Sequence, residues 1–188
     1  MNDLNRVSED LSHVRDALRR SEERVSPPSV YLLWAVLSFV GMSLFDHDPQ
    51  VAGMFWAVAG PLGGILSGWL GWRWSRRLGQ ESSEEGRRHA LHWTAMMVAI
   101  LATVPLVATG AIPHPVLGRV ILLIIALSYF MAGIYLDRNQ LWLGLIVLGC
   151  YFGMFFVRQY AWTITGTVLG LSLLFLAWQE GRRGARAA

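Results

Sequence analysis

Six long apolar segments divide the chain, and this division limits what it can fold into more than any other feature. A helix needs about 20 apolar residues, usually about 17 to 25, to cross the hydrocarbon core of a bilayer. The segments cover approximately residues 30–45, 51–72, 90–111, 117–136, 141–157 and 162–178. The first, fifth and sixth are short and would need little tilt or slight thinning of the bilayer. We therefore predict an all-α polytopic membrane protein with six transmembrane helices.

Composition supports a membrane protein and excludes several other classes. The chain is 54% apolar and 15% charged, whereas a soluble domain averages about 45–50% and about 25%. A soluble enzyme and a disordered chain do not fit these values. The single cysteine, Cys150, excludes an intramolecular disulfide and a CxxC metal site. We expect no cofactor.

The sequence divides into three parts. Residues 1–28 are predicted to form a cytoplasmic amphipathic helix that ends at Pro27-Pro28, residues 29–179 the six-helix membrane domain, and residues 180–188 a basic tail. The first 28 residues lack the apolar core of a cleavable signal peptide, and their six acidic residues argue against a mitochondrial presequence. We expect direct insertion into a bacterial-type inner membrane.

Arginine positions predict the orientation. All sixteen basic residues are arginines, and with a cytoplasmic N-terminus fourteen of them lie inside, while only Arg119 and Arg158 lie outside. An excess of basic residues in short cytoplasmic loops is the usual signature of topology. Both termini are therefore predicted to be cytoplasmic. This distribution also accounts for the net charge of +3, and we expect no nucleic-acid partner because no recognition motif accompanies it.

The N-terminal segment carries the clearest interaction signal. Its apolar residues follow a heptad pattern, with Leu4, Leu11 and Leu18 at position a and Val7 and Val14 at position d. In a parallel coiled coil, Asp10 at position g would face Arg15 at position e of a neighbouring chain. We predict that this helix drives homo-oligomerisation. Association with a partner protein's helix, or a single amphipathic helix on the membrane or on its own bundle, are the alternatives.

Small residues form a ladder in the second predicted span. They recur every three or four positions: Gly53, Ala57, Gly60, Gly64 and Gly68. Such spacing lets helix backbones approach closely, as in GxxxG pairs. Pro61 lies among these glycines and predicts a kink or a broken helix. The ladder is interpreted either as a helix-packing groove or as an unwound segment whose backbone carbonyls line a pore.

A weak internal similarity suggests that the three last spans repeat the first three. Residues 30–39 match residues 120–129 at five of ten positions, and the third and sixth spans both begin with Trp-Thr. A repeat of three spans would be inverted in the membrane. Because apolar sequences match easily by chance, the repeat remains a hypothesis.

Little catalytic chemistry is available. No ionisable side chain lies near the middle of a predicted span, which disfavours carboxylate-coupled transport. No protease, hydrolase or nucleotide-binding motif is present, so we expect no enzyme activity and assign no catalytic residue. Asp46, His47, Asp48 and His114 are low-ranking candidates for a metal site at the outer surface; loop aspartates more often cap turns.

Two functions follow from these observations. The first is a non-catalytic assembly, sensing or regulatory subunit that associates through its N-terminal heptad helix. The alternative is an oligomeric passive channel or facilitator, whose pore would be lined by the second span and by neutral hydroxyl groups. Polar residues for such a path are Ser38, Ser43, Ser67, Thr103, Ser128, Tyr129, Thr165, Thr167 and Ser172.

Overall fold

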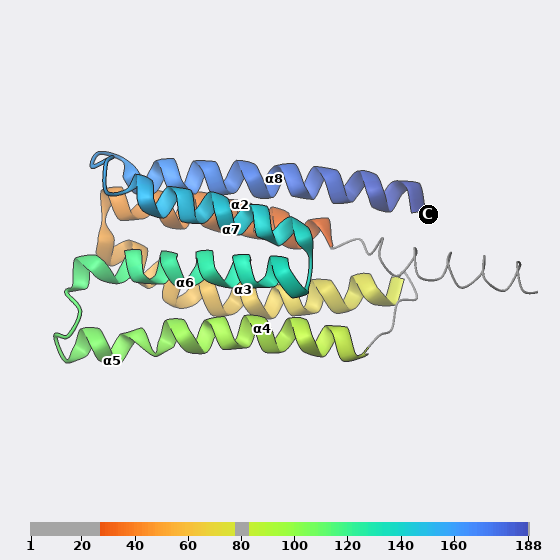
Figure 1. Cartoon of the computed structure of the whole chain (residues 1–188), viewed down its shortest axis with the longest axis horizontal. Coiled ribbons are helices and arrows are strands. Elements are labelled where there is room, and N and C mark those ends of the chain that lie inside the picture. Colours follow the sequence, from red (N-terminus) through yellow and green to blue (C-terminus); the bar gives the residue numbers. More distant parts are fainter. Residues whose placement is uncertain (1–26, 78–82, 188) are drawn as a thin grey trace, which may run out of the picture.

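The computed structural model is an antiparallel helical bundle, and it describes residues 27–77 and 83–187 (Figure 1). No strand occurs within these two ranges. The helices are α2 (Pro28–His47), α3 (Pro49–Arg77), α4 (Ser83–Leu101), α5 (Thr103–Ala108), α6 (His114–Tyr135), α7 (Arg138–Gly153) and α8 (Ala161–Ala187). The all-α prediction is therefore confirmed.

In the described part of the chain, five segments are long and apolar enough to cross a membrane: Pro28–His47, Pro49–Arg77, Gly86–Ala108, Pro115–Tyr135 and Ala161–Arg183. The fifth predicted span corresponds to α7, which has 16 residues and a length of about 24 Å, less than the hydrocarbon core of about 30 Å. Turn hydrogen bonds continue from its end to Val157. Five spans are thus supported, and α7 runs back between α6 and α8 inside the bundle (Figure 1).

The break in the membrane helices lies at Pro105 and not at Pro61. Helix α3 continues through Pro61, so of the two predicted outcomes, a kink or a broken helix, the break is wrong and the kink stays a prediction. A proline removes one hydrogen bond to the carbonyl four residues earlier and its ring crowds that carbonyl. For Pro105 this carbonyl belongs to Leu101, where α4 ends before α5 begins at Thr103. The Thr103 hydroxyl donates to the Ile100 carbonyl at 2.6 Å and stabilises this junction.

Two helices extend beyond the predicted apolar segments. Helix α4 begins at Ser83, and an ion pair between Arg88 and Glu84 at 2.7 Å supports its first turns. Helix α8 continues to Ala187, so residues 180–187 of the predicted basic tail are helical. Charged residues at the end of a membrane helix leave its backbone hydrogen bonds intact. The apolar run therefore predicts which residues cross the membrane, but it does not predict where the helix ends.

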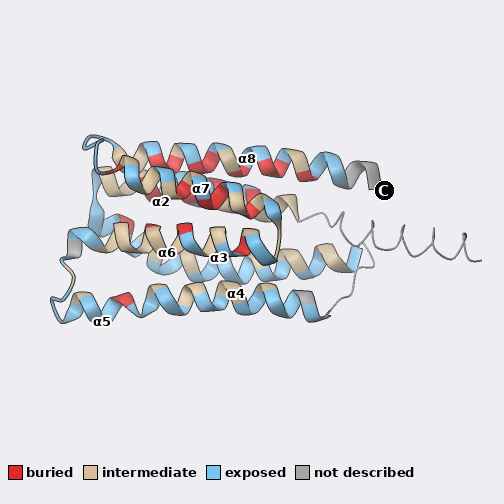
Figure 2. Cartoon of the chain, in the orientation of Figure 1, coloured by how far each residue is buried: buried red, intermediate tan, exposed pale blue. Residues whose placement is uncertain are grey.

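The core lies between α2, α6, α7 and α8. Extensive contacts link the helices in the order α3, α2, α8, α7, α6 and α4. Leu122, Leu143, Val147 and Leu173 are almost completely buried in this core. Figure 2 shows buried residues concentrated on α2, α7 and α8, whereas α3 and α4 are largely exposed. The two helices at the ends of this order thus present most of their apolar surface outward.

Close packing inside the bundle depends on glycines that the sequence did not single out. A Cβ at Gly144 of α7 would lie 2.5 Å from the Phe130 backbone nitrogen of α6, and one at Gly133 would overlap the backbone of Leu141. A Cβ at Gly166 of α8 would lie 3.0 Å from the Ser38 carbonyl oxygen of α2. Glycine therefore allows α6 and α7, and α2 and α8, to approach each other closely.

The order in which the helices pair is compatible with an inverted repeat, although the equivalent contacts differ in extent. Helix α2 packs on α3 and on α8, and its counterpart α6 packs on α7 and on α4. The end of α2 meets the start of α8 through Phe45 and Trp162, and the end of α6 meets the first half of α4 through Tyr135 and His92. The contact of α7 with α8 has no counterpart of similar extent between α3 and α4 in the described residues. The repeat therefore stays a hypothesis that this pairing supports.

Candidate functional site

The predicted oligomerisation helix lies outside the described residues. This applies to every residue of its heptad pattern and of its predicted charge pair, which are Leu4, Val7, Asp10, Leu11, Val14, Arg15 and Leu18. The prediction that this helix self-associates stays untested.

The glycines of the α3 ladder face away from the other described helices. A Cβ added at Gly53, Gly60, Gly64 or Gly68 would meet no atom within 4 Å. Gly63, which is not part of the ladder, is the glycine of α3 that packs inward, against Trp34 and Leu37 of α2. The ladder therefore packs against no helix of its own chain among the described residues, and neither its role in helix packing nor its role in a pore is seen there.

A broad apolar groove lies between α2 and α3. Its volume is about 570 Å³, and it is lined almost entirely by aliphatic and aromatic side chains, including Leu37, Met54, Val58 and Leu62. Met54, Val58 and Leu62 are each more than half exposed. No charged group lines this groove, so it provides an apolar surface without chemistry of its own.

Most hydroxyl groups of the predicted permeation path are used locally. Ser43, Ser67, Thr165, Thr167 and Ser172 each donate to the carbonyl four residues earlier, at 2.7–2.8 Å. Such bonds satisfy the hydroxyl within its own helix. These groups do not converge on a polar channel inside the described part of the chain.

The two aspartates among the candidates for a surface metal site, Asp46 and Asp48, are engaged as helix caps. Asp48 accepts hydrogen bonds from the backbone nitrogens of Gln50 and Val51 at 2.9 and 3.1 Å, at the start of α3. His47 is exposed, and the side chain of His114 lies outside the described residues. Within the described ranges no group of three or more His, Cys, Asp or Glu residues is arranged to hold a metal.

Asp46 joins the end of α2 to the start of α8. Its carboxylate oxygens accept hydrogen bonds from the backbone nitrogens of Thr163, at 2.6 Å, and Trp162, at 3.4 Å. The first backbone N–H groups of a helix have no partner within that helix. The negative charge also opposes the positive end of the α8 dipole. Asp46 is therefore a cap supplied by a residue far away in the sequence.

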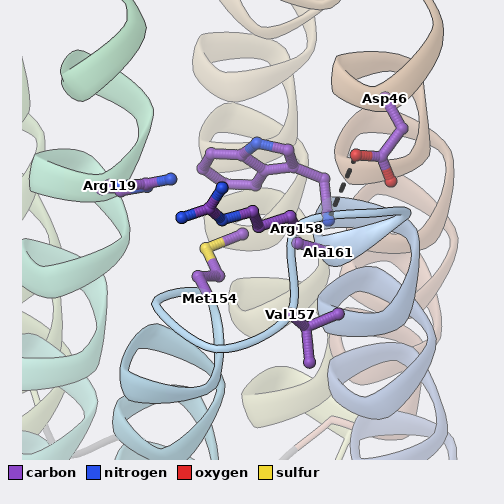
Figure 3. A pocket seen from close by; sticks show the side chains of 7 residues that line it. Asp46, Arg119, Met154, Val157, Arg158 and Ala161 are labelled. Atoms are coloured by element: carbon purple, nitrogen blue, oxygen red, sulfur yellow. Dashed lines mark hydrogen bonds between the residues drawn. The ribbon is translucent and has the colours of Figure 1, made fainter.

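A pocket of about 200 Å³ lies beside this cap, between the ends of α2 and α7 and the starts of α6 and α8. Asp46, Arg119, Arg158 and Trp162 supply its polar and aromatic lining. In Figure 3 the guanidinium groups of Arg119 and Arg158 both reach into this space. Tyr160, in the connection that carries Arg158 to α8, has a left-handed backbone with φ of 55°, which is uncommon for a residue with a side chain.

At the opposite end of the bundle, a buried polar cluster joins α2, α7 and α8. The Asn139 amide donates to a Glu180 carboxylate oxygen at 3.1 Å, and Arg183 donates to the same oxygen at 2.9 Å. The Gln140 amide donates to the Tyr31 hydroxyl at 3.3 Å, while its own oxygen is buried without a hydrogen-bond partner. Glu180 is 1% exposed. These polar contacts therefore hold α2, α7 and α8 together at the end of the bundle, beyond the apolar core.

Sequence reasoning missed this cluster although a signal was present. Leu169, Leu173 and Ala177 lie on the buried face of α8, and Glu180 continues their spacing of three or four residues. A polar residue that continues a buried helical face is expected to need a polar partner. Glu180 lies at the end of a predicted span, whereas the sequence argument considered only ionisable residues near the middle of the spans.

No family model matches this chain, and neither a curated protein nor a solved structure resembles it significantly. Any functional inference therefore depends on the residues and geometry described above.

Proposed function

We propose that this protein is a non-catalytic membrane subunit that acts by assembling with further copies of itself. The observation that carries the proposal is the outward position of the α3 ladder. Gly53, Gly60, Gly64 and Gly68 leave a shallow surface, where a Cβ added to any of them would have no neighbour within 4 Å. In a bilayer, small residues at this spacing favour close packing with another helix.

The position of α3 within the bundle supports the same conclusion. Helix α3 contacts α2 extensively and stands at one end of the order of packed helices. A second chain can therefore reach its ladder without rearranging the core. The predicted N-terminal heptad helix would add a second contact on the cytoplasmic side. When one contact forms, it raises the effective concentration of the partner surfaces for the other contact. A short coiled coil can therefore contribute to the stability of the assembly.

The proposed setting is a bacterial-type inner membrane with both termini in the cytoplasm. The termini of the described chain, at Pro28 and Ala187, lie at the same end of the bundle (Figure 1). The C-terminal end of α3 and the start of α7, where Arg76 and Arg138 lie, are at this end too. An excess of arginine on the cytoplasmic side is the arrangement that the positive-inside rule favours.

An oligomeric passive channel is the second candidate, and the same exposed ladder is the observation in its favour. Because α3 is continuous through Pro61, it has no unwound segment whose carbonyls could line a site in a single chain. A permeation path would have to form between α3 helices of adjacent copies. Flux that depends on Gly64 would favour the channel over a purely structural assembly.

The proposal is tested with two leucine substitutions. Gly64→Leu places a large side chain on the ladder, and Gly149→Leu places the same side chain on α7 at another position with nothing within 4 Å. At both positions the new side chain starts in open space among the described residues. We expect Gly64→Leu to lower the ratio of oligomer to monomer at least tenfold in native mass spectra, and Gly149→Leu to leave it unchanged. Equal ratios in both variants would exclude the ladder as an interface.

A further inference from the structure

The pocket at the end of the bundle opposite the termini is assembled from four separate elements. Asp46 comes from α2, Arg119 from the second turn of α6, Arg158 from the connection after α7, and Trp162 from the first turn of α8. The pocket has a volume of about 200 Å³, and Met154, which also lines it, is buried. Side chains from distant parts of the sequence thus converge on one small, partly enclosed space.

The charges that line the pocket are not balanced. Two guanidinium groups face one carboxylate, and the Asp46 carboxylate already accepts from the backbone nitrogens at the start of α8. Within the described ranges, neither Arg119 nor Arg158 has a carboxylate within ion-pair distance; the ion pairs there join Arg88 to Glu84 and Arg183 to Glu180. Arg119 instead lies 5.4 Å from the centre of the Phe155 ring. The pocket therefore keeps an excess of positive charge.

The location of these two arginines is also exceptional. The other arginines of the described helices lie at the end of the bundle away from the pocket, near the end of α3, the start of α4, the start of α7 and the end of α8. Arg119 and Arg158 are the two that topology would place on the outer side, where basic residues are disfavoured. Both line the same pocket, and Figure 3 shows their guanidinium groups directed toward the same space. Two positive charges directed toward one space, beside a single carboxylate that already accepts from the start of α8, favour an anion there.

We propose that this pocket binds a phosphate group between Arg119 and Arg158. Each guanidinium presents a planar fork of N–H donors that suits bidentate contact with phosphate oxygens. The pocket lies at the ends of apolar helices, at the level where lipid headgroups meet a membrane protein, and Trp162 is of the type that anchors there. The phosphate belongs to a phospholipid headgroup or to a soluble phosphate, and the proposal does not depend on self-assembly.

Two binding measurements on the full-length protein in an uncharged detergent distinguish these sources. The first titrates inorganic phosphate and follows heat release. The second adds phosphatidylglycerol and counts retained lipid molecules by native mass spectrometry. The test variant is Arg119→Gln/Arg158→Gln. The matched control is Arg73→Gln/Arg76→Gln, which removes two arginines at the other end of the bundle, where they lie over Trp69 and Trp72.

We expect one probe to bind the wild-type protein at a single site, and the test variant to weaken its binding at least tenfold. The control variant should bind within about twofold of the wild type. Binding of phosphatidylglycerol alone identifies a lipid headgroup, and binding of inorganic phosphate identifies a soluble ligand. Absence of binding of both probes, or equal loss in test and control variants, overturns the proposal.

If the glutamine variant does not fold, Arg119→Lys/Arg158→Lys replaces it, because lysine keeps the positive charge and removes the planar fork of N–H donors. Unchanged binding in that variant overturns the bidentate geometry.

Discussion

The contact between α6 and α7 provides a quantitative test of the bundle. In Gly144→Ala the new methyl group would lie 2.5 Å from the backbone nitrogen and 2.7 Å from the Cα of Phe130. Backbone atoms cannot rotate away as a flexible side chain can, so the two helices must separate. Overpacking of this kind costs about 1–3 kcal/mol. Gly149→Ala is the matched control, because it lies in the same helix with nothing within 4 Å of its Cβ.

Both substitutions change the helix propensity of α7 by a similar amount, about 1 kcal/mol in favour of alanine. This contribution cancels when the variants are compared. We expect Gly144→Ala to be less stable than Gly149→Ala by about 1–3 kcal/mol, measured by reversible unfolding in mixed micelles with increasing denaturing detergent. Equal stability of the two variants would refute the close approach of α6 and α7.

Three further predictions test other parts of the structure. Asp46→Ala removes the acceptor for the Thr163 backbone nitrogen, and we expect a loss of about 0.5–2 kcal/mol in the same unfolding assay; unchanged stability would argue against the cap. Glu180→Ala removes a side chain that is 1% exposed and should cost about 1–3 kcal/mol, so an effect below about 0.5 kcal/mol would show that the cluster is dispensable. In a chain without its native cysteine, Asp48→Cys should react with an impermeant thiol reagent added outside intact cells and Ser83→Cys should not; the reverse pattern contradicts the orientation.

The apolar pattern predicted the all-helical fold and the five segments that are long and apolar enough to cross a membrane, because a bilayer demands long uninterrupted apolar segments; the sixth predicted span is not supported. It predicted the position of helix ends poorly. Helix α8 continues through charged residues to Ala187, since charged side chains are compatible with a helix once it leaves the hydrocarbon. The fifth segment forms a helix of only 16 residues, which is shorter than its apolar run because the final residues form turns.

Packing between helices was less predictable than the helices themselves. The ladder of α3 was the most conspicuous small-residue pattern, yet Gly133, Gly144 and Gly166, which lie outside it, are among the glycines that meet other helices within the chain. Spacing shows that small residues share a face, but it does not show which helix covers that face. Similarly, Pro61 and Pro105 both lie inside a predicted apolar span, but a helix break occurs only near Pro105.

The two polar sites depended on residues that are distant in sequence. Arg119 and Arg158 were recognised as the two outer arginines, but their convergence on one pocket required the folded arrangement of α6 and α7. The contact of Glu180 with Asn139 spans 41 residues. Such pairs leave no local pattern, because each partner alone is compatible with an ordinary helix end.

The central claim is that the protein assembles with itself, and the native mass of the complex extracted gently from its own membrane tests this claim most directly. A single species at an integer multiple of 21.0 kDa, converted to smaller species by Leu11→Asp or Gly64→Leu, is the expected result. A monomer in the wild-type extract, or a complex that contains a different polypeptide in place of further copies, would contradict it.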